Sequence, residues 1–206
     1  MRTSIYIDGF NFYYLAVRKT AYKWLDFKSL FTKVLAPNHK ILSIKYFTAI
    51  VAGTPDDLQK PITQQTYIRA LENFIQEFSV YYGHFMKHKV MMPIANPNSS
   101  KKFELVIKTE EKGSDVNLAA HLINDAWSNK YDCAIVVSND SDLAEAMRLV
   151  KVLGKSIGLV MPGKGHPSKE LMQYADFIKR IREWVLKNSQ LPDLISGTNI
   201  RKPVEW

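Results

Sequence analysis

Residues 133–142 read CAIVVSNDSD and decide the fold class. The first five residues form a short, wholly apolar run, which is typical of a strand that is covered on both faces of a sheet. Five polar residues follow at once, and Leu143, Ala146, Met147 and Val150 then recur at helical spacing. A buried strand that passes through a polar turn into a one-faced helix is the repeating unit of an alternating α/β chain.

The same order of strand and helix recurs along the chain. Strand-like runs are predicted at residues 5–7, 41–51, 79–85, 103–109, 134–137, 156–161 and 177–181. Helical spacing is predicted at residues 10–18, 63–78, 116–127, 143–153 and 168–174. This alternation indicates a mainly parallel sheet with right-handed crossovers, hence a Rossmann-like three-layer α/β/α sandwich. Residues 91–102 hold two prolines and paired serines, which predict a loop.

Length and composition predict one soluble domain. With 206 residues the chain can bury one sizeable core, and we expect a domain at 1–190 with a loosely attached tail at 191–206. The tail has little periodicity. The N-terminal sequence has no signal-peptide pattern and the chain has no apolar span long enough for a bilayer, so a cytoplasmic location is expected. The single cysteine, Cys133, lies in an apolar run, which predicts a buried structural thiol and fits a reducing compartment.

Charge favours a polyanionic partner. Lys and Arg total 28 against 20 for Asp and Glu, which gives a net charge of +8. The excess continues toward the C-terminus, where residues 151–206 carry 10 basic and 5 acidic side chains. These basic groups either neutralise phosphates or keep the surface soluble, and the sequence leaves both open.

Four aspartates stand where strands are expected to meet helices. Asp8 follows the first strand, Asp115 begins the helix at 116–127, and Asp140 and Asp142 follow the strand at 134–137. Because the carboxyl ends of parallel strands share one edge of a sheet, we expect these groups to converge. Carboxylates held together repel unless a cation lies among them. With no cluster of Cys and His, hard oxygen ligands point to Mg²⁺ or Mn²⁺.

Simpler roles compete with this interpretation. Asp8 or Asn11 could cap the first helix, and Asp115 is favoured at a helix N-terminus in any protein. The segment with Asp140 is the most specific, because the helix dipole offers only about 0.3–1 kcal/mol for each acid placed there. Ser138 could bind a phosphate or orient an acid. The pair at 110–111 is taken as a solvated charge run.

Three segments give the chain a resemblance to the NYN domain family, in the LabA-like branch of the PIN-like nuclease fold. They are YIDGFN at residues 6–11, KGSDV at 112–116 and VSNDSD at 137–142, in the family's order. The likeness covers roughly residues 1–185. It implies an α/β/α sandwich whose acids bind Mg²⁺ or Mn²⁺ and hydrolyse RNA.

The resemblance also assigns roles to residues. It implies that the metal ligands are Asp8, Asp115, Asp140 and Asp142, with Asn11 and Ser138 in support. The substrate contacts that we expect beside them are Lys112, Asn139 and Lys164. RNA is the expected partner.

Two other functions stay open at this point. One is a non-catalytic RNA-binding or regulatory module that uses the same fold. The other is an enzyme on a small molecule, such as the aromatic-ring hydroxylase associated with one branch of similar layout. The aromatic residues Phe10, Phe12, Tyr13 and Tyr14 could line a pocket for such a substrate, but we interpret them as core. No Gly-x-Gly-x-x-Gly pattern for a dinucleotide follows a strand. A homo-oligomer is possible through the tail, which ends in Trp206.

Overall fold

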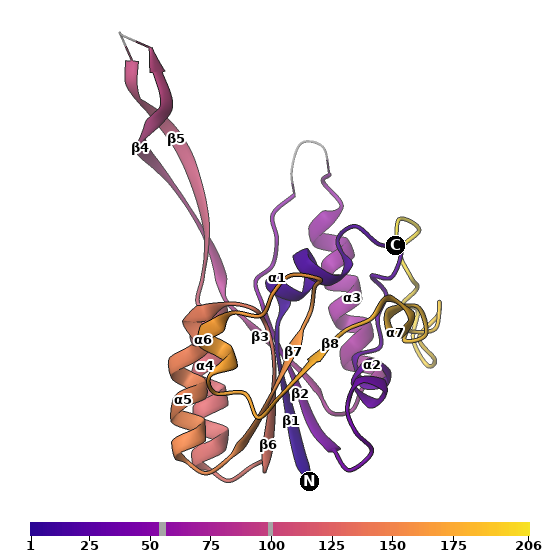
Figure 1. The fold of residues 1–206 in the computed structure, drawn as a ribbon. Helices are drawn as coiled ribbons and strands as arrows, with labels where there is room; N and C mark the ends of the chain where they lie inside the picture. The colour runs from indigo at the N-terminus through magenta and orange to yellow at the C-terminus, as the bar shows by residue number, and fades with distance from the viewer. Residues whose placement is uncertain (54–56, 99–100) are drawn as a thin grey trace.

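A six-stranded parallel sheet forms the centre of the molecule (Figure 1). The computed structural model describes residues 1–53, 57–98 and 101–206. The strands lie in the order β3-β2-β1-β6-β7-β8. Their bounds are Arg2–Asp8 for β1, Lys40–Thr48 for β2, Phe78–Tyr82 for β3, Cys133–Val137 for β6, Ser156–Met161 for β7 and Phe177–Arg180 for β8. The predicted parallel α/β sheet is therefore confirmed.

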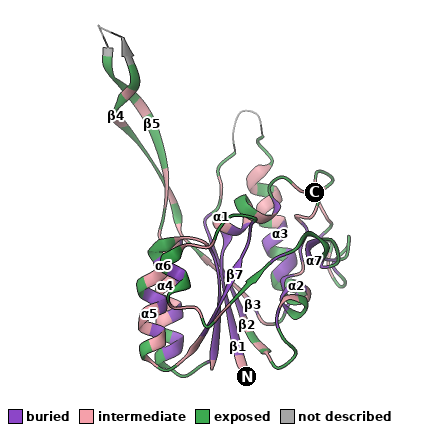
Figure 2. Cartoon of the chain, viewed as in Figure 1, coloured by how far each residue is buried: buried purple, intermediate pink, exposed green. Residues whose placement is uncertain are grey.

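Helices cover both faces of this sheet and make the expected three layers (Figure 1). One face carries α4 (Ser114–Trp127), α5 (Ala144–Val152) and α6 (Lys169–Met172). The other carries α2 (Phe27–Val34), α3 (Lys60–Phe74) and α7 (Glu183–Lys187). Successive residues of β1 point to opposite faces, so Ile5 and Ile7 join one buried cluster while Tyr6 joins the other. Figure 2 shows the buried sheet between the two helical layers.

The first helical segment is short and irregular. α1 (Gly9–Phe12) begins directly after β1 and continues as a π-helix, η1 (Tyr13–Val17). Gly9 permits this abrupt turn, because a Cβ there would lie 2.7 Å from the carbonyl oxygen of Phe47 and 2.7 Å from the ring of Tyr46. The close approach places the first turn of the helix against the end of β2.

A long antiparallel hairpin replaces the loop that we predicted at 91–102. β4 (His84–Asn98) pairs with β5 (Lys101–Lys112) as a separate two-stranded sheet, which projects away from the body (Figure 1). The prediction was wrong because prolines are tolerated in this setting. Each strand of a two-stranded ribbon has an unpaired edge, so Pro93 can lie in a strand without removing a required hydrogen bond.

The tail at 191–206 is packed, which corrects the expectation of loose attachment. Leu191, Ile195 and Ile200 are buried in the same cluster as α2, α3 and α7. The ring of Trp206 lies 5.2 Å from that of Tyr67, so it packs on its own chain. Apolar residues in an irregular segment leave no periodic pattern, which is why the sequence did not reveal this packing. The domain boundary at residue 190 stays a prediction, and so does a homo-oligomer.

Two smaller expectations concern compartment and membrane. Cys133 is buried in β6 and free, as predicted for a structural thiol. Among the described residues, no helix combines the length and hydropathy needed to cross a bilayer.

Candidate metal centre

The candidate site lies at the middle of the sheet, where the order of strands reverses. From β1 the chain moves to β2 and β3 on one side, while β6 lies on the other side of β1. Asp8 ends β1, and Asp140 follows β6 by three residues. Ligands of parallel α/β sheets bind at such a switch point, outside the carboxyl ends of the strands. Topology therefore brings two acids that are distant in sequence to one crevice.

Three carboxylates converge there. Asp8, Asp115 and Asp140 each offer an oxygen, and these atoms lie within 4.8 Å of one another. In the described part of the chain none of the three forms an ion pair with Lys or Arg. They share a depression, here called the acid cleft, whose polar wall is Asp8, Asn11, Glu111, Ser114, Asp115 and Asp140.

Mutual repulsion and burial make this cluster unfavourable when it is fully ionised. Burial, reinforced by the charges of Asp8 and Asp140, raises the pKa of Asp115 to about 6. Burial is also the main cause that raises the pKa of Asp8. A divalent cation would remove both penalties, and carboxylate oxygens are the donors that Mg²⁺ and Mn²⁺ prefer. The residues present therefore fit such an ion.

Hydrogen bonds fix the orientation of Asp8. Its Oδ1 accepts a hydrogen bond from the backbone N–H of Asn11 at 2.9 Å, and its Oδ2 accepts one from Oγ of buried Ser138 at 2.9 Å. The same Ser138 oxygen accepts the backbone N–H of Asp140 at 3.1 Å. Asn11 Oδ1 accepts the backbone N–H of Asn139 at 3.0 Å. Asp8 thus caps α1 and belongs to the cluster, and Ser138 and Asn11 act as positioning residues.

The fourth acid of the cleft is Glu111, where the sequence predicted Asp142. Asp142 is exposed, outside the group of three, with its backbone N–H donating to Asp140 Oδ1 at 3.1 Å. Half-buried Glu111 lines the cleft instead, and it accepts hydrogen bonds from Ser114 N at 3.1 Å and Ser114 Oγ at 2.8 Å. Its charge contributes more than that of Asp142 to the raised pKa of Asp115. Glu111 was taken as part of a solvated run, and its distance of three residues from Ser114 is the signal that could have identified it.

The three expected substrate contacts lie outside the acid cleft. Lys112 is exposed at the base of the hairpin, and Lys164 is exposed in the loop after β7. Asn139 holds that loop with its side chain, whose Nδ2 donates to His166 O at 3.1 Å and whose Oδ1 accepts from Ser168 N at 2.7 Å. Its amide is therefore occupied in structure, and direct substrate binding by any of the three stays a prediction.

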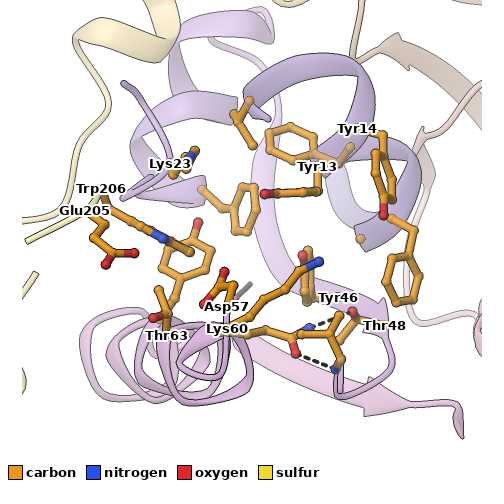
Figure 3. A pocket seen from close by; sticks show the side chains of 18 residues that line it. Tyr13, Tyr14, Lys23, Tyr46, Thr48, Asp57, Lys60, Thr63, Glu205 and Trp206 are labelled. Atoms are coloured by element: carbon orange, nitrogen blue, oxygen red, sulfur yellow. Dashed lines mark hydrogen bonds between the residues drawn. The ribbon is translucent and has the colours of Figure 1, made fainter. Parts of the chain in front are cut away.

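A second hollow lies beside the first. It is a cavity of about 160 Å³ between α1, η1, α3 and the C-terminus, here called the aromatic cavity (Figure 3). Its rings include Phe10, Tyr13, Tyr14, Tyr46, Tyr67 and Trp206. Phe10 and Tyr14 line the acid cleft as well. We interpreted Phe10, Phe12, Tyr13 and Tyr14 as core. Of these only Phe12 is buried, Tyr14 is exposed, and all four line the cavity.

Tyr46 lies at the boundary between the two hollows. Its ring lines the cavity, and its hydroxyl is 2.8 Å from the position that a Cβ on Gly9 would take. Burial and then the charge of Asp8 raise the pKa of Tyr46, so its phenol stays protonated. The aromatic cavity and the acid cleft are therefore close enough to influence each other.

Comparisons with known proteins place the chain in a family. The 6-hydroxy-3-succinoylpyridine 3-monooxygenase of Pseudomonas putida (strain DSM 28022 / S16) is 36% identical over 236 aligned residues, which span 100% of this chain and 75% of that protein. The crystal structure of a protein of unknown function from Vibrio parahaemolyticus RIMD 2210633 has a TM-score of 0.56 and 19% identity, covering 92% of this chain and 96% of that one. That likeness concerns the fold alone. The NYN domain model matches residues 2–182, and the chain therefore belongs to the NYN domain family.

Proposed function

We propose that this protein hydrolyses RNA phosphodiester bonds with Mg²⁺ or Mn²⁺ held by Asp8, Asp115 and Asp140. The observation that carries the proposal is the close set of carboxylate oxygens, within 4.8 Å of one another and without a basic partner among the described residues. Membership of the NYN domain family supports it. Asp142, on the rim, would contribute through a water or from a distance.

Each side chain has a separate task in this proposal. A bound divalent ion would activate water and neutralise charge on the phosphate. Ser138 and Asn11 keep Asp8 and the segment after β6 in fixed positions, so the carboxylates are arranged before the metal arrives. Lys112 and Lys164 are exposed and would neutralise neighbouring phosphates of the chain being cut.

Charge and shape support RNA as the substrate. The hairpin at residues 84–112 holds six Lys and three Glu. It rises from the same edge of the sheet as α1 (Figure 1), and Glu111 at its base lines the acid cleft. A long basic ribbon next to the carboxylates would hold the phosphate backbone on both sides of the cut. The buried free thiol of Cys133 agrees with work in the reducing cytoplasm.

Cleavage assays on the full chain test this function. With single-stranded and structured RNA and Mn²⁺ we expect cleavage that chelation abolishes and that Asp8→Asn and Asp140→Asn each lower by roughly 100-fold or more. Asp193→Asn is the matched control, because that exposed acid lies outside the cleft and should leave the rate unchanged. RNA binding that survives chelation and both cleft variants, without any cleavage, would instead favour a non-catalytic RNA-binding module.

Hydroxylation of an aromatic ring is a second candidate function. The likeness to a protein named as a 6-hydroxy-3-succinoylpyridine 3-monooxygenase, which spans all of this chain and 75% of that protein, favours it, and so does the aromatic cavity next to the carboxylates. Position 3 of the compound in that name carries the succinoyl group and no hydrogen, so the reaction would replace this group. One atom of O₂ forms the new ring hydroxyl, the other becomes water, and the C3–acyl bond breaks with the acyl group leaving as an aldehyde. Two NADH and two protons would supply the four electrons that this balance needs. NADH oxidation that depends on 6-hydroxy-3-succinoylpyridine, with a hydroxylated product seen by mass spectrometry, would establish it. Substrate-independent NADH oxidation, or none, would reject it.

A further inference from the structure

We propose that the aromatic cavity binds one six-membered heteroaromatic ring that carries an anionic group. A pyrimidine nucleotide and a pyridine-type carboxylic acid share this chemistry. The inference deepens the proposed function, because it names the part of the substrate that is held beside the carboxylates. It rests on the cavity itself, so it can be tested without any turnover.

Size restricts the ligand to a single ring. The cavity measures about 160 Å³. A protein cavity of about 150 Å³ lined by apolar side chains is known to hold benzene, so one six-membered ring fits this volume. A purine has a second fused ring and should fit poorly.

Aromatic walls favour a flat ligand. Tyr13 from η1, Tyr46 from β2, Tyr67 from α3 and Trp206 from the tail all line the space (Figure 3). Aromatic rings attract one another in stacked or edge-to-face arrangements beyond the effect of buried area alone. Tyr67 donates its hydroxyl to Leu25 O at 2.9 Å, which holds that ring as a fixed wall.

Two lysines supply the positive charge. Lys23 and Lys60 are half-buried and line the cavity, and in Figure 3 the Lys60 side chain extends from α3 toward its middle. Neither forms an ion pair with a residue that the structure describes. The acids that line the cavity, Asp57 and Glu205, are exposed at the rim. An anion on the ring would therefore meet the Lys60 ammonium group, with Lys23 also on the cavity wall.

The Gln64 amide shapes the cavity wall and is occupied by the chain itself. Gln64 is held by Val51, whose backbone N–H donates to Gln64 Oε1 at 2.9 Å, and by its own bond from Nε2 to Ala49 O at 3.0 Å. Its Nε2 also donates to Thr48 Oγ1 at 3.4 Å. The hydroxyl of Thr63 lies on the same wall. Because the cavity and the acid cleft share Phe10 and Tyr14, a ring bound here would determine which bond of the substrate faces the carboxylates.

Calorimetric binding with the full chain tests the proposal. The probes are uridine 5′-monophosphate, 6-hydroxynicotinate and adenosine 5′-monophosphate, all without metal. At least one single-ring probe should bind, and the adenosine probe should bind about tenfold more weakly or not at all. Uridine 5′-monophosphate binding alone identifies a nucleotide as the natural source of the ring, and 6-hydroxynicotinate binding alone identifies a free heteroaromatic acid. Binding of both means that the ring and its anion suffice.

Variants connect this binding to the cavity. Thr63→Phe should fill the space and abolish binding, while Gln65→Phe, exposed on the same helix and outside the cavity, should have no effect. Lys60→Gln should weaken binding about tenfold or more, with exposed Lys19→Gln as its control. Thermal melts establish whether each variant is folded. If Thr63→Phe does not fold, Lys60→Gln alone decides whether the probe binds in the cavity.

The result that would overturn the proposal is distinct from failure of the hydrolase. Absence of binding by both single-ring probes, or binding that Thr63→Phe and Lys60→Gln leave unchanged, would reject the ring site. Asp8→Asn should keep the affinity for the probe or raise it slightly, because it removes a negative charge that acts on Tyr46 in the cavity wall. Ring binding without RNA cleavage would retain the site and reject the hydrolase, and cleavage without ring binding would do the reverse.

Discussion

The acid cleft and the aromatic cavity lie on two sides of one short helical segment, α1 and η1, and they are built differently. Asp8 and Asp140 follow neighbouring strands, and Ser138 bonds to both, so the cleft is fixed by main-chain topology and short hydrogen bonds. The walls of the cavity come from the first helix, β2, α3 and the last residue of the chain. The cleft concentrates charge, whereas the cavity concentrates rings. The comparison teaches that one site follows from the sheet and the other from how distant segments pack.

The largest expected effect is a loss of Mn²⁺ affinity when an acid of the cleft is replaced, which should leave the aromatic cavity intact. Asp140→Asn should weaken Mn²⁺ binding by about 100-fold or more, because even hydrogen-bond partners of metal ligands contribute about 10–100-fold. Affinity for the ring probe should change far less, because Asp140 does not line the aromatic cavity. Titration calorimetry measures both. Unchanged Mn²⁺ affinity, with Asp193→Asn as the reference, would contradict a metal site in the cleft.

Removal of one positioning hydroxyl should have the next largest effect. In Ser138→Ala, Asp8 loses a donor and the Asp140 N–H loses an acceptor, so Mn²⁺ affinity should fall by roughly 10–100-fold. Its matched control is Ser141→Ala, which alters an exposed hydroxyl three residues further along. Equal affinities in the two variants would mean that Ser138 has no part in the cleft.

A change in the cavity wall should have the opposite pattern: it should lower affinity for the ring probe and leave Mn²⁺ affinity unchanged. Trp206→Ala should lower the free energy of unfolding by about 1–3 kcal/mol, less than for a fully buried Trp, and the Tm by several degrees. The substitution removes the ring that contacts Tyr67, so it should also weaken binding of the ring probe, while Mn²⁺ affinity stays the same. Trp127→Ala is the control, because that side chain is 77% exposed. A tail that can be altered without loss of stability would show that its packing contributes little.

The smallest expected effect is a dependence of stability on pH that comes from the cleft alone. The pKa of Asp115 is about 6 in the folded protein, against an ordinary value of 3.8. The folded state therefore binds more protons between these values, and in metal-free protein this group lowers the free energy of unfolding as pH rises from about 4 to 6. At pH 7.5, Asp115→Asn should raise the Tm by a few degrees.

Melts of wild type and variant across pH 4.5–7.5 measure this effect as a difference, which cancels the contributions of other acids. The Tm gap should be largest at neutral pH and should close on acidification. Saturating Mn²⁺ should raise the Tm of the wild type at pH 7.5 and do so less below pH 6. A gap that widens toward low pH would contradict the raised pKa of Asp115.

Much of the fold could be predicted because it depends on local patterns. The apolar run of β6, the polar turn after it and the one-faced helix that follows are each specified by neighbouring residues. Asp8 and Asp140 follow neighbouring strands, so their shared edge could be predicted as well. Asp142 was placed in the group by the same reasoning, but the turn after Asp140 directs it to the rim.

The features that the sequence did not reveal depend on partners far along the chain. Residues 91–102 were predicted as a loop, because the two strands of the hairpin gain order only from each other, whereas the strand predicted at 103–109 is confirmed within β5. Glu111 is the exception, because its hydrogen-bond partner Ser114 lies only three residues away. Tail residues such as Ile195 show no periodic pattern in the sequence. They become part of the core only by packing against helices that come earlier in the chain.

The sequence by itself determined an alternating α/β chain with acids at the ends of its strands, because the alternation of apolar and polar residues is a local property that any window of about ten residues carries. Only the tertiary structure decided which acids meet, and that Trp206 closes a cavity with Tyr13 and Tyr67. Burial is a property of three-dimensional neighbours. Residues separated by more than a hundred positions acquire those neighbours only when the chain has folded.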